Sequence, residues 1–103
     1  MGTGSGIQAL TALEKTSDVL ASDINPECVE FVKAKGIQAI VSDLFSNIAS
    51  TFDLIIFNPP YLPTDEREDK ESALSTTGGV KGSEVLELFL EQAKSFLNAH
   101  GKI

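Results

Sequence analysis

The segment DLIIFNPPY, residues 53–61, carries the strongest structural signal in the chain. Residues 53–57 form a near-continuous apolar run, which is typical of a strand buried on both faces of a parallel sheet. The prolines that follow cannot donate backbone hydrogen bonds, so the strand is expected to stop there. The segment therefore predicts a buried parallel strand that ends in a rigid turn.

Strands and helices alternate before this segment. Short apolar runs at residues 19–22 and 37–41 predict two more strands, and apolar residues at helical spacing predict a helix over residues 7–15. Asn25 followed by Pro26 is a helix start signal, with a capping side chain and then proline at the first helical position. This part of the chain therefore predicts a helix, a strand, a second helix and another strand.

The chain after this segment is expected to continue the same alternation. Residues 62–81 are mostly polar and predict a long surface loop. Ser83 is expected to cap a helix with an apolar stripe, closed near Gly101. Alternating strands and helices predict an open, mostly parallel α/β sheet with helices on both faces.

The chain is short for an enzyme. Its 103 residues, 42% of them apolar, suffice for one small domain. We therefore expect a single partial domain over residues 1–103. Only Met1 precedes the first glycine, and residues 101–103 look like the first step into another strand, so the domain is expected to be truncated at both ends.

Charge and cysteine content narrow the classes of function. The chain has 15 acidic and 8 basic residues, a net charge of −7, and no run of lysine and arginine, so a broad nucleic-acid surface is not expected. Cys28 is the single cysteine and no Cys/His cluster occurs, so we expect no disulfide, no metal site and a reducing, cytoplasmic setting. No apolar stretch approaches the roughly 20 residues needed to cross a bilayer, so no membrane partner is expected.

Polar residues follow three of the predicted strands. Asp23, Asp43 and the turn at residues 58–61 each come directly after an apolar run. In open parallel α/β sheets, ligands bind at the carboxyl ends of the strands. We therefore expect these residues to gather at one ligand-binding edge.

The loop Gly2-Thr3-Gly4-Ser5-Gly6 contains three glycines in five positions. Glycine has no Cβ, so the backbone of such a loop can approach a ligand closely. Many loops of this composition are simple tight turns, and the loop alone leaves both interpretations open. Its third glycine comes one residue earlier than in the dinucleotide fingerprint, which suits a ligand without phosphate such as S-adenosylmethionine.

Asp23 and Asp43 are candidate ligand-binding acids. Asp23 follows the glycine loop by one strand, and an acid there can accept both hydroxyl hydrogens of a ribose. The alternative role is to cap the following helix, but Asn25 already supplies a cap, so ribose binding is favoured. Asp43 could accept a hydrogen bond from an adenine amino group, and its alternative role is an ordinary Asx turn.

The tetrapeptide Asn58-Pro59-Pro60-Tyr61 is the most informative motif. Prolines have no N–H and a fixed φ angle, so this turn offers aimed carbonyl oxygens with no donors beside them. The side-chain oxygen of Asn58 and the carbonyl of Pro59 could hold the two hydrogens of an amide or amino nitrogen, which turns its lone pair toward a methyl donor. Tyr61 could stack on the flat acceptor group. The alternative is a strand-terminating turn with a packing tyrosine.

Together these residues resemble the class I S-adenosylmethionine-dependent methyltransferases, and within them the HemK/PrmC-like protein glutamine methyltransferases. Residues 2–6 are similar to the glycine motif of that family, and Asp23 is similar to its ribose-binding acid. Residues 42–44 are similar to its adenine-side loop, and residues 58–61 to its catalytic tetrapeptide. Residues 62–63 and 78–82 are more similar to the HemK-like branch found in archaea and eukaryotes than to methyltransferases that act on nucleic acids.

The resemblance implies a Rossmann-like fold, S-adenosylmethionine as cofactor, and methyl transfer to a glutamine side-chain amide. In the family this glutamine typically lies in the Gly-Gly-Gln tip of a peptide-chain release factor. The resemblance also implies a small zinc-binding activator subunit as a partner for some members of this branch. The expected catalytic residues are Asn58, Pro59, Pro60 and Tyr61. The expected cofactor-binding residues are Gly2, Thr3, Gly4, Gly6, Asp23, Ile24, Asp43, Leu44 and Asn58.

Two other functions stay open. An N6-adenine or N2-guanine methyltransferase would use residues 58–61 on an exocyclic amine, although the absence of a basic patch argues against it. A non-catalytic subunit with a methyltransferase fold is opposed by the intact residues 58–61. It is favoured by the lack of the strand that precedes the glycine loop in the family, and this lack also leaves open that the fragment alone is inactive.

Overall fold

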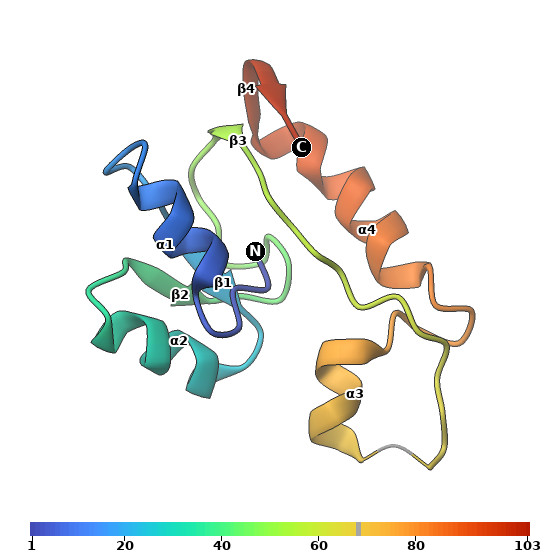
Figure 1. Cartoon of the computed structure of the whole chain (residues 1–103). Coiled ribbons are helices and arrows are strands. Elements are labelled where there is room, and N and C mark those ends of the chain that lie inside the picture. The colour runs from blue at the N-terminus through green and yellow to red at the C-terminus, as the bar shows by residue number, and fades with distance from the viewer. Residues whose placement is uncertain (68) are drawn as a thin grey trace. The chain divides into compact units, whose positions relative to one another are not determined.

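The computed structural model describes residues 1–67 and 69–103 and divides into two compact units, Met1–Ser50 and Thr51–Ile103 (Figure 1). Each unit contains helices and a pair of parallel strands among its described residues. An α/β architecture with parallel strands is therefore confirmed. A single Rossmann-like sheet and a single domain stay predictions.

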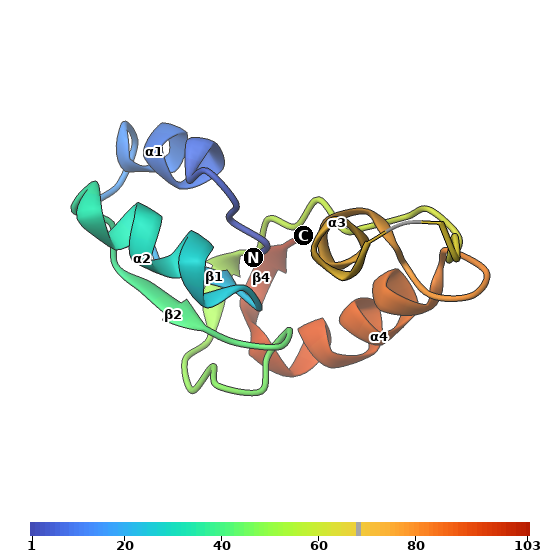
Figure 2. The same cartoon turned by 90° about the horizontal axis from the view of Figure 1, so that it is seen from below.

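The first unit is built around two strands and the helix that connects them. Its elements are α1 (Ile7–Leu13), β1 (Ala21–Asp23), α2 (Pro26–Ala34) and β2 (Ala39–Val41). The strands pair in parallel, with Ala21 opposite Ala39 and Asp23 opposite Val41. A parallel pair needs a crossover connection, and α2 provides it while packing on both strands (Figure 2).

Local sequence explains where α2 begins and ends. The side-chain oxygen of Asn25 accepts a hydrogen bond from the backbone N–H of Glu27 at 2.9 Å, and Pro26 occupies the first helical position. Gly36 follows the helix with a φ angle of 81°, a conformation that favours glycine. The helix predicted from the Asn25 and Pro26 signal is thus confirmed.

Small and branched side chains form the core of the first unit. Val29 and Val32 of α2 are fully buried, and Val32 packs with the buried residues Ala9, Ala21 and Ile37. Full burial of a valine side chain contributes about 1.5–3 kcal/mol. These two valines therefore hold α2 on the strands that carry the candidate acids.

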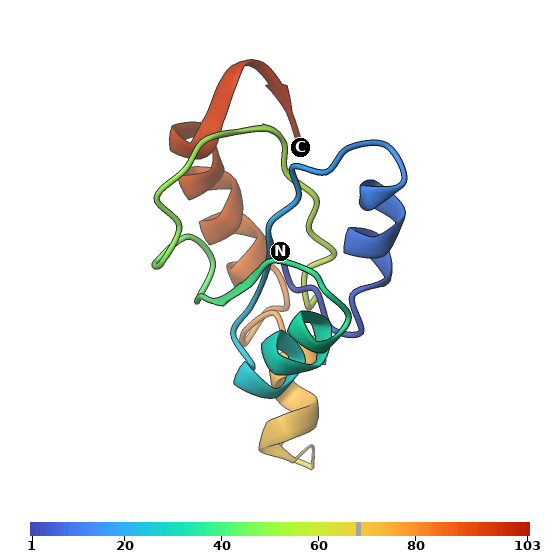
Figure 3. The same cartoon turned by 90° about the vertical axis from the view of Figure 1, so that its left-hand side faces the viewer.

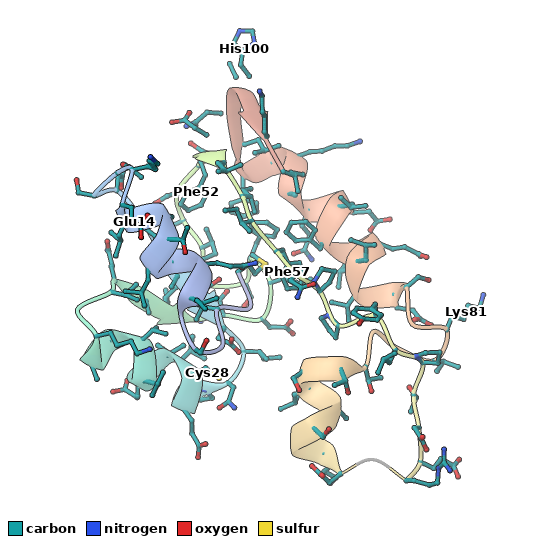
Figure 4. All side chains as sticks on the ribbon, viewed as in Figure 1. Glu14, Cys28, Phe52, Phe57, Lys81 and His100 are labelled. Atoms are coloured by element: carbon teal, nitrogen blue, oxygen red, sulfur yellow. The ribbon has the colours of Figure 1, made fainter. Side chains whose placement is uncertain are left out.

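The second unit contains β3 (Phe52–Leu54), α3 (Lys70–Thr76), α4 (Glu84–Ala93), a 3-10 turn (Lys94–Phe96) and β4 (Leu97–Lys102). The end of α4 leads through this turn into β4 (Figure 3). β3 and β4 pair in parallel with an irregular register, in which Phe52 lies opposite Leu97 and Leu54 opposite Lys102. His100 lies in the irregular part with a φ angle of 66° and projects away from the strand (Figure 4).

The apolar run at residues 53–57 is less covered than its sequence predicts. Beyond β3 the pairing continues through Ile55, whose N–H donates to the Lys102 carbonyl at 2.9 Å. Ile55 is 6% exposed, whereas Leu54 is 57% exposed and Ile56 is 42% exposed. Since alternate residues of an extended chain face opposite sides, one side of this run is buried and the other is not. The expected burial on both faces is therefore wrong.

A helix interrupts the segment that was expected to be a loop over residues 62–81. The Asp69 carboxylate caps α3 by accepting a hydrogen bond from the Ser72 N–H at 2.9 Å. The hydroxyls of Ser75 and Thr76 donate to the Ser72 carbonyl at 2.8 and 3.0 Å. Serine and threonine are weak helix formers, so the composition hid a short helix whose start is stabilised by the Asp69 cap.

Helix α4 ends earlier than the sequence predicts. It stops at Ala93, and Leu97 already pairs with β3, so the expected end near Gly101 is wrong. Ser83 holds the expected N-cap position, but its hydroxyl donates to the Glu87 carboxylate at 2.8 Å rather than capping a backbone N–H. Phe89 and Ala93 are buried and hold the helix in the unit.

Candidate methyltransferase site

Hydrogen bonds of its backbone hold the glycine loop in place, both within the loop and to the rest of the first unit. The Thr3 N–H donates to the Ser22 carbonyl of β1 at 3.0 Å, and the Gly6 N–H donates to the Thr3 carbonyl at 2.8 Å. The ammonium group of Lys35, just after α2, donates to the Ser5 carbonyl at 3.1 Å. The loop is therefore held in one conformation beside the end of β1.

Glycine is required at positions 4 and 6 of this loop for different structural reasons. A Cβ on Gly6 would lie 2.7 Å from a methyl group of Val32, so the loop packs too closely on α2 for any other residue. A Cβ on Gly4 would meet nothing within 4 Å, although its φ angle of 51° also favours glycine. The loop therefore packs against the protein at Gly6 and leaves open space at Gly4.

Asp23 is half-buried at the end of β1 and fixes both the loop and the next helix. One carboxylate oxygen accepts a hydrogen bond from the Gly4 N–H at 2.9 Å, and the other accepts from the Asn25 N–H at 2.9 Å. The bond to Gly4 was not predictable from the sequence, because 19 residues separate the two groups in the chain. A carboxylate oxygen can accept a second hydrogen bond, so each keeps capacity for a ligand hydroxyl.

The Thr3 hydroxyl is a buried polar group without a partner among the described residues. Thr3 is 9% exposed, and its neighbours in the loop use backbone atoms for their hydrogen bonds. A buried polar group without a hydrogen bond costs about 1–3 kcal/mol. The hydroxyl therefore offers a binding group to a ligand seated on the glycine loop.

The turn after β2 contains a residue in a rare conformation. Leu44 is buried and has a φ angle of 48°, in the left-handed region that costs a residue with a Cβ about 1–2 kcal/mol. The Ser42 hydroxyl stabilises this turn by donating to the Leu44 carbonyl at 2.7 Å and accepting from the Asn47 N–H at 3.0 Å. Such conformations are frequent at ligand sites. No sequence pattern predicted the left-handed conformation of Leu44.

Asp43 is exposed beside Leu44, and its carboxylate accepts no hydrogen bond from the described part of the chain. Its backbone N–H donates to the Ser46 hydroxyl at 3.1 Å, so serine side chains and not Asp43 shape this turn. The alternative of an ordinary Asx turn is therefore not what the structure shows. Ile24, next to Asp23, is 44% exposed at the same end of the strand pair.

The register of β1 and β2 brings the two acids to the same edge. Asp23 lies opposite Val41, and the Ser42 N–H donates to the Asp23 carbonyl at 2.9 Å, so Asp43 comes one residue later. The carboxyl ends of β1 and β2 thus bring together the glycine loop, Asp23 and Asp43. Residues 58–61 belong to the second unit, and their place at the same edge stays a prediction.

The tetrapeptide presents an accessible amide and an accessible ring. Asn58 is exposed, and its side chain makes no hydrogen bond with the described residues. Pro59 and Pro60 are half-buried, whereas Tyr61 is 71% exposed. A packing tyrosine would be covered, so that alternative does not describe this turn.

The residue before the tetrapeptide anchors it to α4. The ring of Phe57, which is labelled in Figure 4, packs on the ring of Phe89, with centroids 4.8 Å apart and planes tilted by 56°. Phe89 is 2% exposed, so this aromatic contact is buried. It fixes the point at which the chain enters residues 58–61.

Cys28 lies in the first turn of α2, near Asp23. Burial raises the pKa of its thiol above the ordinary value, and the negative charges of Asp23 and Glu27 raise it further. The thiol is therefore protonated at neutral pH and is a poor nucleophile.

Within residues 1–67 and 69–103, no three His, Cys, Asp or Glu side chains are grouped to hold a metal ion. None of the described helices has the length and apolar character to span a membrane.

Comparison with known proteins defines the class. A family model described as "Eco57I restriction-modification methylase" matches residues 8–103. Because this match covers most of the sequence, the chain belongs to this family of methylases.

Proteins that are similar in sequence indicate more closely which kind of methylase this chain resembles. A protein of Methanocaldococcus jannaschii named as a protein N5-glutamine methyltransferase is 35% identical over the whole chain, which covers 57% of that relative. The release factor glutamine methyltransferase of Aquifex aeolicus is 33% identical over the whole chain, which covers 43% of it. A bifunctional methyltransferase of Rickettsia felis is 31% identical, with 23% covered. These relatives confirm the resemblance to the HemK/PrmC-like protein glutamine methyltransferases.

Proposed function

We propose that this chain is the core of an S-adenosylmethionine-dependent methyltransferase that methylates a glutamine side-chain amide in a protein such as a peptide-chain release factor. The names of the relatives support this acceptor. The chain spans about half the length of the first of them and less of the others. The observation that carries the proposal is the unpaired, exposed amide of Asn58 at the head of a donor-free proline turn.

The first unit fits the cofactor. S-adenosylmethionine, when bound, supplies an electrophilic methyl group on a sulfonium centre. The free lone pairs of Asp23 suit the ribose hydroxyls, and the Asp43 carboxylate suits the adenine amino group. The Thr3 hydroxyl and the open side of Gly4 offer a polar group and space beside the loop. The remaining expected cofactor-binding residues are Gly2, Gly6, Ile24, Leu44 and Asn58.

The second unit orients the acceptor. An amide nitrogen is a weak nucleophile because its lone pair is delocalised. The Asn58 side-chain oxygen and the Pro59 carbonyl accept its two hydrogens, which turns the lone pair toward the methyl carbon. These two oxygens would also stabilise the positive charge that develops on the nitrogen as it takes the methyl group. One proton then leaves for water, so no strong base is needed. Pro60 fixes the turn, and the exposed ring of Tyr61 is available to stack on the amide.

The test separates cofactor binding from methyl transfer. In calorimetric titrations with S-adenosylmethionine, Asp23→Ala is expected to abolish binding, whereas Asp18→Ala, an exposed aspartate outside the site, is expected to leave it unchanged. Asn58→Ala is expected to bind the cofactor normally and to lower kcat on a Gly-Gly-Gln peptide by about 100-fold. The control is Asn98→Ala, an exposed asparagine of the same unit whose side chain donates to Asp53 at 2.9 Å and lies outside the tetrapeptide. Normal transfer by Asn58→Ala would overturn the proposal.

A nucleic-acid acceptor is the second candidate. The matching family model takes its name from a restriction–modification methylase, and an exocyclic amine has the same two hydrogens as an amide. The net charge of −7 weighs against it, because phosphate binding needs clustered lysine and arginine.

We also propose that residues 1–103 belong to one domain, that the protein is cytoplasmic, and that a small zinc-binding activator subunit is its partner. The branch that residues 62–63 and 78–82 resemble supports the last point.

A further inference from the structure

Residues 76–82 run alongside the chain that leaves the tetrapeptide. Leu62 and Thr77 form a parallel bridge, in which the Leu62 N–H donates to the Thr76 carbonyl at 2.8 Å and the Gly78 N–H donates to the Leu62 carbonyl at 2.9 Å. The Thr64 N–H extends the contact by donating to the Gly79 carbonyl at 3.0 Å. The backbone after the tetrapeptide is therefore paired and not free.

Gly78 lies against the tetrapeptide itself. A Cβ at Gly78 would lie 2.6 Å from the Pro60 carbonyl oxygen and would also collide with the Gly82 carbonyl. The φ angle of Gly78 is outside the left-handed region, so its backbone would accept another residue. Glycine is required at position 78 because there is no room for a Cβ, and not because of its backbone conformation. Any side chain at this position would have to displace Pro60 or Gly82.

Gly82 makes the second close approach. A Cβ on Gly82 would lie 2.6 Å from the Tyr61 carbonyl oxygen and 3.2 Å from the Pro63 nitrogen. Its φ angle of 94° adds a conformational reason for glycine. Two consecutive carbonyl groups, of Pro60 and Tyr61, are thus covered by the backbone of two glycines.

The segment is in turn fixed to α4. The Glu84 carboxylate accepts hydrogen bonds from the Lys81 N–H at 2.8 Å and the Gly82 N–H at 3.1 Å. The Val85 N–H donates to the Gly78 carbonyl at 3.0 Å. Since Phe57 also packs on α4, this helix supports the chain on both sides of residues 58–61.

We propose that residues 76–82 are a positioning element for the tetrapeptide, in which Gly78 and Gly82 set the place of the Pro60 and Tyr61 carbonyls and thereby the aim of Asn58 and Pro59. The inference rests on the proposed function, because it assigns a role in the same reaction. Neither glycine touches the acceptor. Both act through the turn that does.

The positioning role predicts a loss in kcat and not in cofactor binding. A displacement of about 1 Å in a catalytic group can cost about 100-fold in rate. Gly78→Ala and Gly82→Ala are therefore expected to lower kcat for glutamine methylation by about 10- to 100-fold, with the Kd for S-adenosylmethionine within about twofold of the unaltered protein. Since the cofactor site lies in the first unit, circular dichroism and a thermal melt of each variant are needed to show that the second unit, which contains both glycines, is folded.

Gly36→Ala is the control for conformational cost. Gly36 has a φ angle of 81°, close to that of Gly82, but a Cβ there would meet nothing within 4 Å. This variant carries the same backbone strain without a collision at the tetrapeptide, so its kcat is expected to be unchanged. Gly78→Ala carries the collision without the strain, and the comparison separates the two effects.

Amide hydrogen exchange tests the pairing without any substitution. The amides of Leu62, Thr64 and Gly78 are expected to exchange much more slowly in the full protein than unpaired amides, and Gly78→Ala is expected to speed their exchange. Unprotected amides, or unchanged kcat in both glycine variants, would overturn the positioning role. Failure of the unaltered protein to methylate glutamine would instead overturn the proposed function, and the positioning role would fall with it.

Discussion

Asp23 connects the glycine loop, β1 and α2 through a single carboxylate. Its two oxygens hold the Gly4 and Asn25 N–H groups, which lie on opposite sides of it in the chain. A carboxylate with two fixed backbone donors presents its remaining lone pairs in a defined direction. The same residue thus builds the loop and offers the binding groups, so a structural role and a ligand role do not exclude each other here.

The Cys28 thiol provides a pH test at the scale of one residue. Burial and the nearby acids raise its pKa, so the reactive thiolate forms only at higher pH than in an unfolded chain. Alkylation by iodoacetamide at pH 8 is expected to be severalfold slower in the folded protein than in urea. Glu27→Gln removes one of the charges and is expected to quicken it modestly. Mass spectrometry across a pH series gives both rates, and equal rates in folded and unfolded protein would contradict the expectation.

Glu84 provides a pH test at the scale of one element. The pKa of its carboxyl lies below the ordinary value, chiefly because it accepts a hydrogen bond from the Lys81 N–H, with further bonds from its own N–H and that of Gly82. A lowered pKa means that the carboxylate stabilises the folded turn above the ordinary pKa of glutamate, and that this support is lost as the pH falls through the lowered value.

Nuclear magnetic resonance can follow this titration at the Gly82 amide. The proton shift of Gly82 is expected to change with a midpoint below about 4.3, the ordinary value for glutamate. Glu84→Gln is expected to remove the transition, whereas Glu87→Gln, one turn along α4, is expected to keep it. A midpoint at or above the ordinary value would show that the carboxylate does not hold this turn.

The elements that the sequence predicted well are those with local signals. Asn25 and Pro26 marked the start of α2 because capping is decided within a few residues. α3 escaped prediction because a stretch of serine and threonine reads as loop unless the cap at Asp69 is recognised. The exposure of Leu54 and Ile56 depends on which neighbours cover the strand, and the composition of the strand does not contain that information.

At the scale of the whole molecule, the acidic charge provides a test of the acceptor. With a net charge of −7 and no basic run, the protein is expected to show no binding to duplex DNA at tens of micromolar in about 0.15 M salt, measured by fluorescence anisotropy. A Gly-Gly-Gln peptide is expected to accept methyl groups under the same conditions. Tight DNA binding that weakens steeply with added salt would favour the exocyclic amine instead.

The residues that carry the chemistry of the candidate site were predictable from the sequence. The contacts that hold these residues in place were less so. Asp23 and residues 58–61 stand out because acids and prolines after apolar runs are visible in sequence. The Thr3 hydroxyl and the close approach of Gly78 to Pro60 are not, since each depends on contacts between distant segments. The left-handed Leu44 is held by local hydrogen bonds of Ser42, which no sequence pattern indicated. Glycine-rich residues 78–82 gave a partial signal, which by itself fitted a flexible loop equally well.

The bridge between Leu62 and Thr77 closes residues 63–76 into a loop of their own. The entropy of closing a loop grows slowly with its length, so residues can be added at small cost between Thr64, which is bonded to Gly79, and the start of α3 at Lys70. The tetrapeptide lies outside the closure and would not move. One part of the second unit can therefore diverge rapidly in sequence to suit new protein surfaces, while the neighbouring part keeps the same reaction.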